Sequence, residues 1–169
     1  MPHPATLPLE QFLAECQARR QRRGGPGGQH RNKVASGVFL KHLPTGVEVS
    51  ATERRSQADN QRMAIERLRI RLATEVRSPV VIPVVPSPLW QARCHGARLR
   101  VSPVHPDFAA LLAEALDTLA GADWNIPVAA ERLRCTRTQL VNLIRLSPEA
   151  FVELNRQRAT LGLRPLKGE

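Results

Sequence analysis

The chain has 169 residues, of which 42% are hydrophobic, which allows one or two small domains with a modest core. Aromatic residues make up only 4% and tyrosine is absent, which argues against an RNA-binding sheet of stacked aromatics. No apolar stretch approaches the roughly 20 residues that cross a bilayer, so no membrane partner is expected. Three scattered cysteines and an N-terminus without a signal-peptide pattern predict a reduced, cytoplasmic protein with no disulfide framework and no metal site.

Positive charge is concentrated in one block of the chain. Lys and Arg number 25 against 15 Asp and Glu, which gives a net charge of +10. Residues 16–77 hold 14 of the basic residues and 5 of the acidic ones, and nearly all of these cations are arginines. Arginine binds phosphate through two parallel hydrogen bonds. The charge therefore predicts a polyanionic partner, RNA or DNA.

The first half of the chain is expected to combine a sheet with a long helix. A short helix is predicted over 7–16 and an extended or irregular segment over 17–23. Two strand-like segments, 36–43 and 47–52, flank the turn sequence Pro44-Thr45-Gly46 and predict a β-hairpin. Ser56 is expected to cap a helix that runs to about Val76.

The second half is expected to be helical. Six prolines between residues 78 and 106 predict a partly extended linker with a short strand near 80–85. Amphipathic segments predict helices over 106–119, 128–133 and 136–145 and a last one from Pro148 to about Thr160. We therefore expect an α+β fold. A domain at 1–77 has a hairpin packed on a long helix, a Pro-rich linker spans 78–105, and a small all-α domain spans 106–169.

Residues 124–145 are similar to a helix-turn-helix. Apolar side chains would pack both helices, and Thr136 would cap the second one. Thr136–Gln139 would then be exposed at the end of the helix where nucleic-acid readers place their contacts. A generic three-helix unit explains the same apolar pattern, so both interpretations stay open.

The segment GGPGGQHRNK, residues 24–33, is the most informative part of the sequence. It lacks the Gly-Lys-Ser/Thr ending of a P-loop and the glycine spacing of a dinucleotide site. Glycines let a backbone approach a ligand closely and offer its N–H groups as donors. Flanking arginines would hold an anionic ligand near those donors. A flexible glycine-rich linker is the alternative interpretation.

Four pieces of the sequence occur in a specific order. They are Gly27-Gly28-Gln29 followed by His30, then Asn32-Lys33, then the turn at 42–46, then Arg55-Ser56-Gln57 with Asn60 at the start of a helix. In this order they resemble the catalytic domain of class I peptide-chain release factors and of their ribosome-rescue relatives. The resemblance covers residues 22–72.

The resemblance implies an enzyme, a peptidyl-tRNA hydrolase that acts on the ribosome without a cofactor. Gly27 and Gly28 would hold the catalytic backbone shape, and the backbone N–H of Gln29 would stabilise the developing oxyanion. The implied partners are large-subunit rRNA and P-site peptidyl-tRNA, together with a methyltransferase that modifies Gln29. The positions expected to bind RNA are Arg22, Arg23, His30, Arg31, Asn32, Lys33, Arg54, Arg55, Ser56, Gln57 and Asn60.

Departures from the family pattern refine this expectation. Arg31 and Val34 stand where an apolar residue and a threonine are usual. The residues after the catalytic block do not resemble the domain that reads stop codons, so codon-independent release or ribosome rescue is expected. The C-terminal helices would add a nucleic-acid contact. One alternative is a non-enzymatic RNA- or DNA-binding regulator that uses those helices, and another is a hydrolase of free peptidyl-tRNA.

Overall fold

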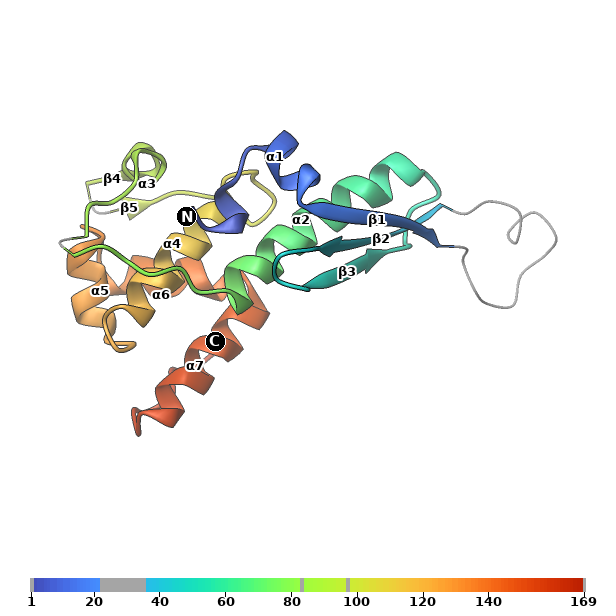
Figure 1. Ribbon diagram of the computed structural model, residues 1–169. Coiled ribbons are helices and arrows are strands. Elements are labelled where there is room, and N and C mark those ends of the chain that lie inside the picture. The colour runs from blue at the N-terminus through green and yellow to red at the C-terminus, as the bar shows by residue number, and fades with distance from the viewer. Residues whose placement is uncertain (1, 22–35, 83, 97, 169) are drawn as a thin grey trace. The chain divides into compact units, whose positions relative to one another are not determined.

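The computed structural model describes residues 2–21, 36–82, 84–96 and 98–168. They form two compact units, one of residues 7–72 and one of residues 1–6 with 73–169. The elements mix helix and sheet, which confirms the predicted α+β class (Figure 1). The predicted domain boundaries at 77 and 105 stay a prediction, and each unit is described below by itself.

The unit of residues 7–72 contains a three-stranded antiparallel sheet in the order β1-β2-β3. The strands are β1 (Cys16–Gln21), β2 (Gly37–His42) and β3 (Glu48–Ala51), and helix α1 (Leu9–Ala14) precedes them. The predicted hairpin is confirmed, with Val38 paired to Ala51 and Lys41 to Glu48. Gly46 has a φ of +74°, a left-handed conformation that glycine adopts without strain.

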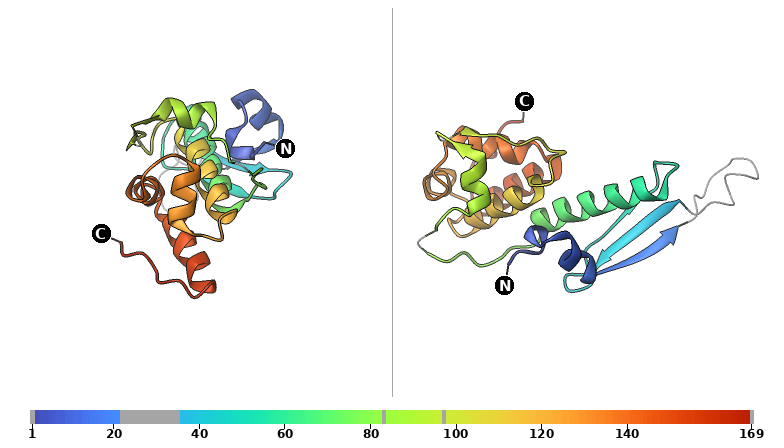
Figure 2. Two further views of the ribbon diagram at one scale, coloured as in Figure 1. Left: turned by 90° about the vertical axis from the view of Figure 1, so that its left-hand side faces the viewer. Right: turned by 90° about the horizontal axis from the view of Figure 1, so that it is seen from above.

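Helix α2 (Gln57–Glu75) lies along one face of this sheet (Figure 2). Side chains alternate along β2, so Val38 and Leu40 are buried while Phe39 is half-buried. Leu68 and Leu72 of α2 are fully buried and form part of its apolar face. Ser56 caps α2, since its Oγ accepts a 3.3 Å hydrogen bond from the backbone N–H of Asp59. The helix ends one residue before the predicted Val76.

The second unit is built mainly from four helices, which are the four that the amphipathic pattern predicted. They are α4 (Phe108–Ala120), α5 (Ile126–Arg132), α6 (Arg137–Arg145) and α7 (Pro148–Thr160), with a short 3-10 helix η1 (Pro4–Thr6) against α4. The inward residues predicted for α4, Phe108, Leu111, Leu112, Ala115 and Leu119, are all buried. The helix is in fact enclosed on nearly every side, since Ala109, Ala113, Leu116, Asp117 and Thr118 are buried as well. Each of α5, α6 and α7 begins with a side-chain cap, supplied by Asn125, Thr136 and Ser147.

The proline-containing segment 78–105 holds ordered elements that the sequence did not predict. It contains helix α3 (Pro88–Arg93) and a two-stranded sheet of β4 (Cys94–His95) and β5 (Arg98–Leu99). The predicted strand near 80–85 is wrong, since the described residues there form no strand. Trp90 anchors α3: its side chain is 1% exposed, and its Nε1 donates a 2.9 Å hydrogen bond to the carbonyl of Leu133.

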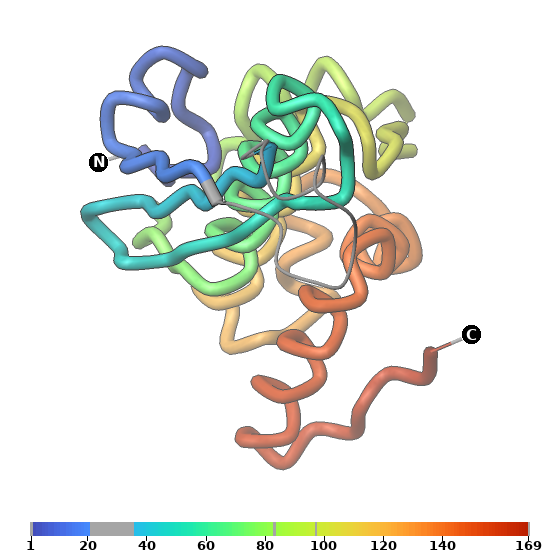
Figure 3. Tube along the Cα trace, turned by 90° about the vertical axis from the view of Figure 1, so that its right-hand side faces the viewer, coloured from blue at the N-terminus to red at the C-terminus, as the bar shows by residue number. Residues whose placement is uncertain are grey.

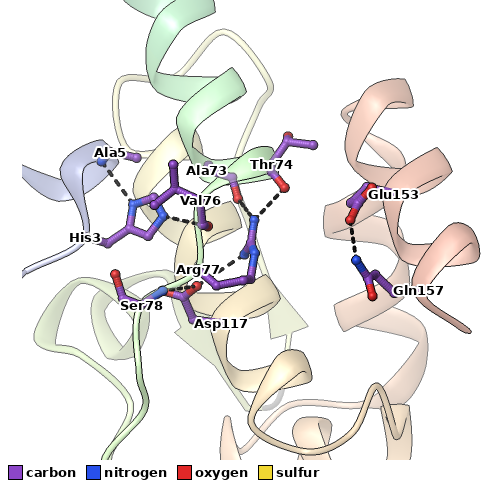
Figure 4. Close-up of polar contacts among 10 residues, drawn as sticks. All are labelled: His3, Ala5, Ala73, Thr74, Val76, Arg77, Ser78, Asp117, Glu153 and Gln157. Atoms are coloured by element: carbon purple, nitrogen blue, oxygen red, sulfur yellow. Dashed lines mark hydrogen bonds and ion pairs between the residues drawn. The ribbon is translucent and has the colours of Figure 1, made fainter. Parts of the chain in front are cut away.

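A buried polar cluster joins α4 to the residues that follow α2 (Figure 4). One carboxylate oxygen of Asp117 accepts hydrogen bonds from the backbone N–H of Ser78 at 3.0 Å and from Arg77 at 3.2 Å. Arg77 also donates to the carbonyl of Thr74. Burial raises the pKa of Asp117 to about 6, although Ser78 and Arg77 oppose this shift. Burial also lowers the pKa of Arg77.

After α7 the chain turns back along that helix (Figure 3). The side chain of Asn155 exchanges two hydrogen bonds with the backbone of Leu166, at 2.7 and 3.1 Å. Arg145 donates to the carbonyl of Lys167, and Arg158 donates to that of Arg164. These contacts order the C-terminal residues against α6 and α7. Among the helices of the described residues, none is long and apolar enough to span a membrane.

Candidate functional site

Strands β1 and β2 bring together the two ends of the segment that carries the Gly-Gly-Gln sequence. They pair antiparallel along their full length, up to Gln21 opposite Gly37. The predicted catalytic residues Gly27, Gly28 and Gln29 lie between these strands in the sequence and outside the described residues. The same holds for the predicted RNA-binding residues Arg22, Arg23, His30, Arg31, Asn32 and Lys33.

The side chain of Asn60 contacts Ser36, the first described residue after this segment. Asn60 has no exposed surface, and its Nδ2 donates to the carbonyl of Ser36 at 2.6 Å and to that of Arg54 at 2.9 Å. Its Oδ1 accepts a 2.9 Å hydrogen bond from the backbone N–H of Arg54. One amide therefore fixes the start of β2 and the turn before α2, using both its donors and its acceptor.

The other described residues of the predicted RNA-binding set lie on that turn and on the first turn of α2. Arg54, Arg55 and Ser56 are exposed and Gln57 is half-buried. Because Asn60 holds Arg54 by both backbone groups, these side chains project from a fixed backbone. Asn60 differs from them, since it is buried and its polar atoms are used within the protein. The RNA-binding role stays a prediction for all five residues.

Much of the arginine charge on α2 has a structural use that the composition did not reveal. Arg67 forms a 2.8 Å ion pair with Glu53 and donates to the carbonyl of Ser50. The hydrogen bond from Arg67 lowers the pKa of Glu53. Arg69 donates to the carbonyl of Leu7, and its guanidinium lies 4.7 Å from the centre of the Phe12 ring. These arginines thus attach α2 to β3 and to α1, which reduces the charge available for an external anion.

His42, at the end of β2, serves a structural purpose as well. It is 1% exposed and stacks on Phe12, with ring centres 6.1 Å apart. Its two ring nitrogens contact the Thr45 hydroxyl at 2.8 Å and a carboxylate oxygen of Glu15 at 2.9 Å. The ring thereby connects the hairpin turn to the C-terminal end of α1. His42 thus stabilises the hairpin, and the sequence did not reveal Glu15 as its partner.

The three cysteines are free, and burial raises the pKa of each thiol, to about 11 for Cys16 and about 12 for Cys135. Thiols with raised pKa values are poor nucleophiles at neutral pH. Within the described ranges, no group of three His, Cys, Asp or Glu side chains could hold a metal ion.

Residues 13–79 match the RF-1 domain family. Over 73 residues the chain is 41% identical to peptide chain release factor 1 of Symbiobacterium thermophilum, which covers 43% of this chain and 20% of the relative. Over 51 residues it is 51% identical both to peptide chain release factor 1 of Lactiplantibacillus plantarum and to peptide chain release factor 2 of Treponema pallidum, which covers 30% of this chain and 14% of each relative. The chain thus matches only a fifth or less of the length of these three relatives.

Proposed function

We propose that this chain, whose residues 13–79 belong to the class I release factor GGQ domain family, hydrolyses the ester of P-site peptidyl-tRNA on the ribosome. The observation that carries the proposal is the placement of Gly27-Gly28-Gln29 between two strands that pair as far as Gln21 and Gly37. We propose further that release is independent of the codon, which the codon arms of the assay below test directly.

The proposed chemistry needs no nucleophilic side chain from the protein. The backbone N–H of Gln29 would donate to the oxyanion that develops as water attacks the ester. One preorganised donor of this kind lowers a barrier by about 2.7–4 kcal/mol in other enzymes. Positioning of the water against the ester supplies a further part of the acceleration. Gly27 and Gly28 would permit the backbone conformation that presents this donor.

The proposed partners follow from the same assignment. Large-subunit rRNA would contact the exposed side chains of Arg54 and Arg55 and the arginines that flank the glycines. A methyltransferase would modify the side chain of Gln29, and the protein would act in the cytoplasm. Binding to rRNA requires exposed cations on a fixed backbone, and the turn held by Asn60 provides them.

The test is release of labelled peptide from purified ribosomes that carry P-site peptidyl-tRNA. The A site is left empty, filled with a sense codon or filled with a stop codon, and free peptidyl-tRNA serves as substrate control. Gly28→Ala is compared with the matched variant Gly168→Ala, where an added Cβ meets no atom within 4 Å.

We expect release that needs the ribosome, ignores the codon, persists in Gly168→Ala and is lost in Gly28→Ala. Gln29→Ala should lower release moderately and admit nucleophiles larger than water. If the wild-type chain binds ribosomes and releases nothing under any condition, the proposal is overturned and the non-enzymatic alternative is favoured. Equal hydrolysis of free peptidyl-tRNA would favour the other alternative.

A further inference from the structure

The small β4–β5 sheet is fastened to the turn between α5 and α6. The backbone N–H of Leu99 in β5 donates a 3.2 Å hydrogen bond to Oε1 of Gln139 in α6. The Cys94 thiol lies 3.8 Å from the carbonyl of Arg134, in the turn. Cys94 and Leu99 pair directly across the small sheet. These contacts place the sheet and the N-terminal end of α6 next to each other.

The β4–β5 sheet, the α5–α6 turn and the start of α6 carry four exposed arginines, which we call the arginine surface. They are Arg98 and Arg100 at β5, Arg134 in the turn, and Arg137 at the first position of α6. Arg98 and Arg100 share one side of the extended chain because side chains alternate along a strand. Among the residues that the structure describes, none of the four guanidinium groups forms an ion pair or a hydrogen bond.

The arginine surface differs in its pairing from the neighbouring Arg93. Glu131 is the one acidic residue of α5 and is exposed. Arg93, in the adjoining α3, is by contrast neutralised by Asp107, with an N···O distance of 2.6 Å. Exposed guanidinium groups without a protein partner, carried on elements that lie next to each other, favour an anionic partner with several phosphates.

Arg134 has a left-handed backbone conformation, which is unfavourable for residues that carry a Cβ. Its φ is +53°, in the left-handed region. The N–H groups of Arg134 and Cys135 bond to the carbonyls of Glu131 and Ala130, which is the helix ending that usually carries glycine at this position. Helix α7 ends in the same way and does carry glycine, at Gly162 with a φ of +68°. Strain at an exposed, unpaired arginine points to a use for its side chain.

The N-terminal residues of α6 are poorly placed to read bases. The Thr136 hydroxyl accepts from the backbone N–H of Gln139, and the Gln139 side-chain oxygen accepts from Leu99. A helix that reads DNA sequence uses such N-terminal polar side chains on base edges. These two oxygen acceptors are thus engaged inside the protein, which leaves Arg137 and Thr138 exposed at this end of α6. A cation such as Arg137 binds the phosphate backbone without regard to sequence.

We propose that the arginine surface binds the phosphate backbone of double-stranded RNA. The choice of RNA over DNA rests on the proposed function, since an enzyme that acts on the ribosome meets RNA helices. Recognition of an RNA duplex through backbone and shape needs no base readout. The arginine surface is thus a second RNA contact of the chain, distinct from the residues that flank the Gly-Gly-Gln sequence.

The test measures binding of the full chain to a fluorescently labelled RNA duplex of about 16 base pairs by anisotropy, between about 50 and 200 mM salt. The test variant is Arg134→Gly/Arg137→Ala. The matched control is Arg164→Ala/Lys167→Ala, which removes the same charge from exposed positions of the same unit. Duplex DNA of the same sequence is a parallel arm. Gly28→Ala is included because it should abolish release and leave duplex binding unchanged.

We expect the test variant to bind the RNA duplex about tenfold more weakly or worse, with a log–log salt slope lower by about two. The control variant should bind like the wild type. Equal losses in both variants would overturn the proposal, because overall charge alone would explain the binding. A loss confined to the DNA arm would overturn the assignment to RNA. The release assay fails or succeeds independently of these outcomes, so the two proposals are tested separately.

Discussion

The side-chain amide of Asn60 donates a 2.6 Å hydrogen bond to the backbone carbonyl of Ser36, which lies 24 residues earlier in the chain. Ser36 directly precedes β2 and is 5% exposed. Asn60 is fully buried, so the hydrogen bond is shielded from water. Since the same amide also holds Arg54, one side chain sets the spacing between the entry of β2 and the start of α2. We expect the candidate site to depend on this spacing.

Asn60→Ala is expected to destabilise the unit of residues 7–72. It leaves the buried carbonyl of Ser36 without this partner, which costs about 1–3 kcal/mol. Thermal unfolding followed by circular dichroism measures the effect. Gln61→Ala is the matched control, since it removes an exposed amide from the same helix. An unchanged melting temperature for Asn60→Ala would contradict the structural role.

Asn60→Ala should also lower peptide release at temperatures where the variant is folded. The variant loses the side-chain amide that holds both Ser36, at the start of β2, and the backbone of Arg54. The position of these two segments relative to each other is then less well fixed. Ribosome binding and release are compared at saturating enzyme, so that weaker binding and slower hydrolysis are separated. Full activity in a folded Asn60→Ala variant would show that the anchor is dispensable for the reaction.

Trp90 tests whether the proline-containing segment 78–105 is part of a folded core. Trp90→Ala should destabilise the chain by about 3–5 kcal/mol, because it empties a buried site. Trp90→Phe keeps most of the apolar volume and loses the hydrogen bond to Leu133, so a smaller cost of about 1–2 kcal/mol is expected. Urea unfolding measures both variants, with Val85→Ala at an exposed position of the same segment as control. Near-neutral effects would mean that the segment behaves as a linker.

Asp117 makes stability depend on pH. Its pKa is about 6 in the folded chain, against an ordinary value of 3.8, mainly because the carboxyl is buried. Between these values the folded state holds a proton that the unfolded state has released, so the contribution of Asp117 to stability falls as the pH rises.

Comparison with Asp117→Asn isolates this effect. The melting temperature of the wild type relative to that of the variant should be highest near about pH 4 and decline toward about pH 7. Other titrating groups cancel in the difference between the two proteins. The variant keeps an oxygen that can accept from Ser78 and Arg77, so a folded control is expected. A difference that does not vary with pH, or one that rises with it, would refute the assignment.

Arg134→Gly is expected to leave stability unchanged or to raise it by up to about 1 kcal/mol. Glycine relieves the left-handed backbone, and the entropy it adds to the unfolded state opposes part of that gain. Differential scanning calorimetry of the single variant measures the balance. Together with weaker RNA binding, higher stability would show an arginine kept for function at some cost to the fold. A clear loss of stability would mean that the side chain supports the fold instead.

Local pattern was enough to predict the hairpin at 37–51, the cap at Ser56 and the helices α4 to α7. Each of these depends on residues close together in sequence: alternation around Pro44-Thr45-Gly46, a hydroxyl before a helix, or an apolar face repeated every three to four residues. The ordered motif pieces likewise indicate the release factor family, because a family resemblance depends on the order of residue types alone.

Only the tertiary structure decided what depends on distant partners. Strand β1 is polar along most of its length, so its pairing with β2 is what makes it a strand. Helix α3 is fixed by the long-range bond from Trp90 to Leu133, and Asn60 by Ser36 and Arg54. The arginines show the same contrast: composition established their number, whereas the fold uses Arg67 and Arg69 internally and leaves Arg98, Arg100, Arg134 and Arg137 exposed. Charge belongs to a residue, but its availability depends on which groups the fold brings near it.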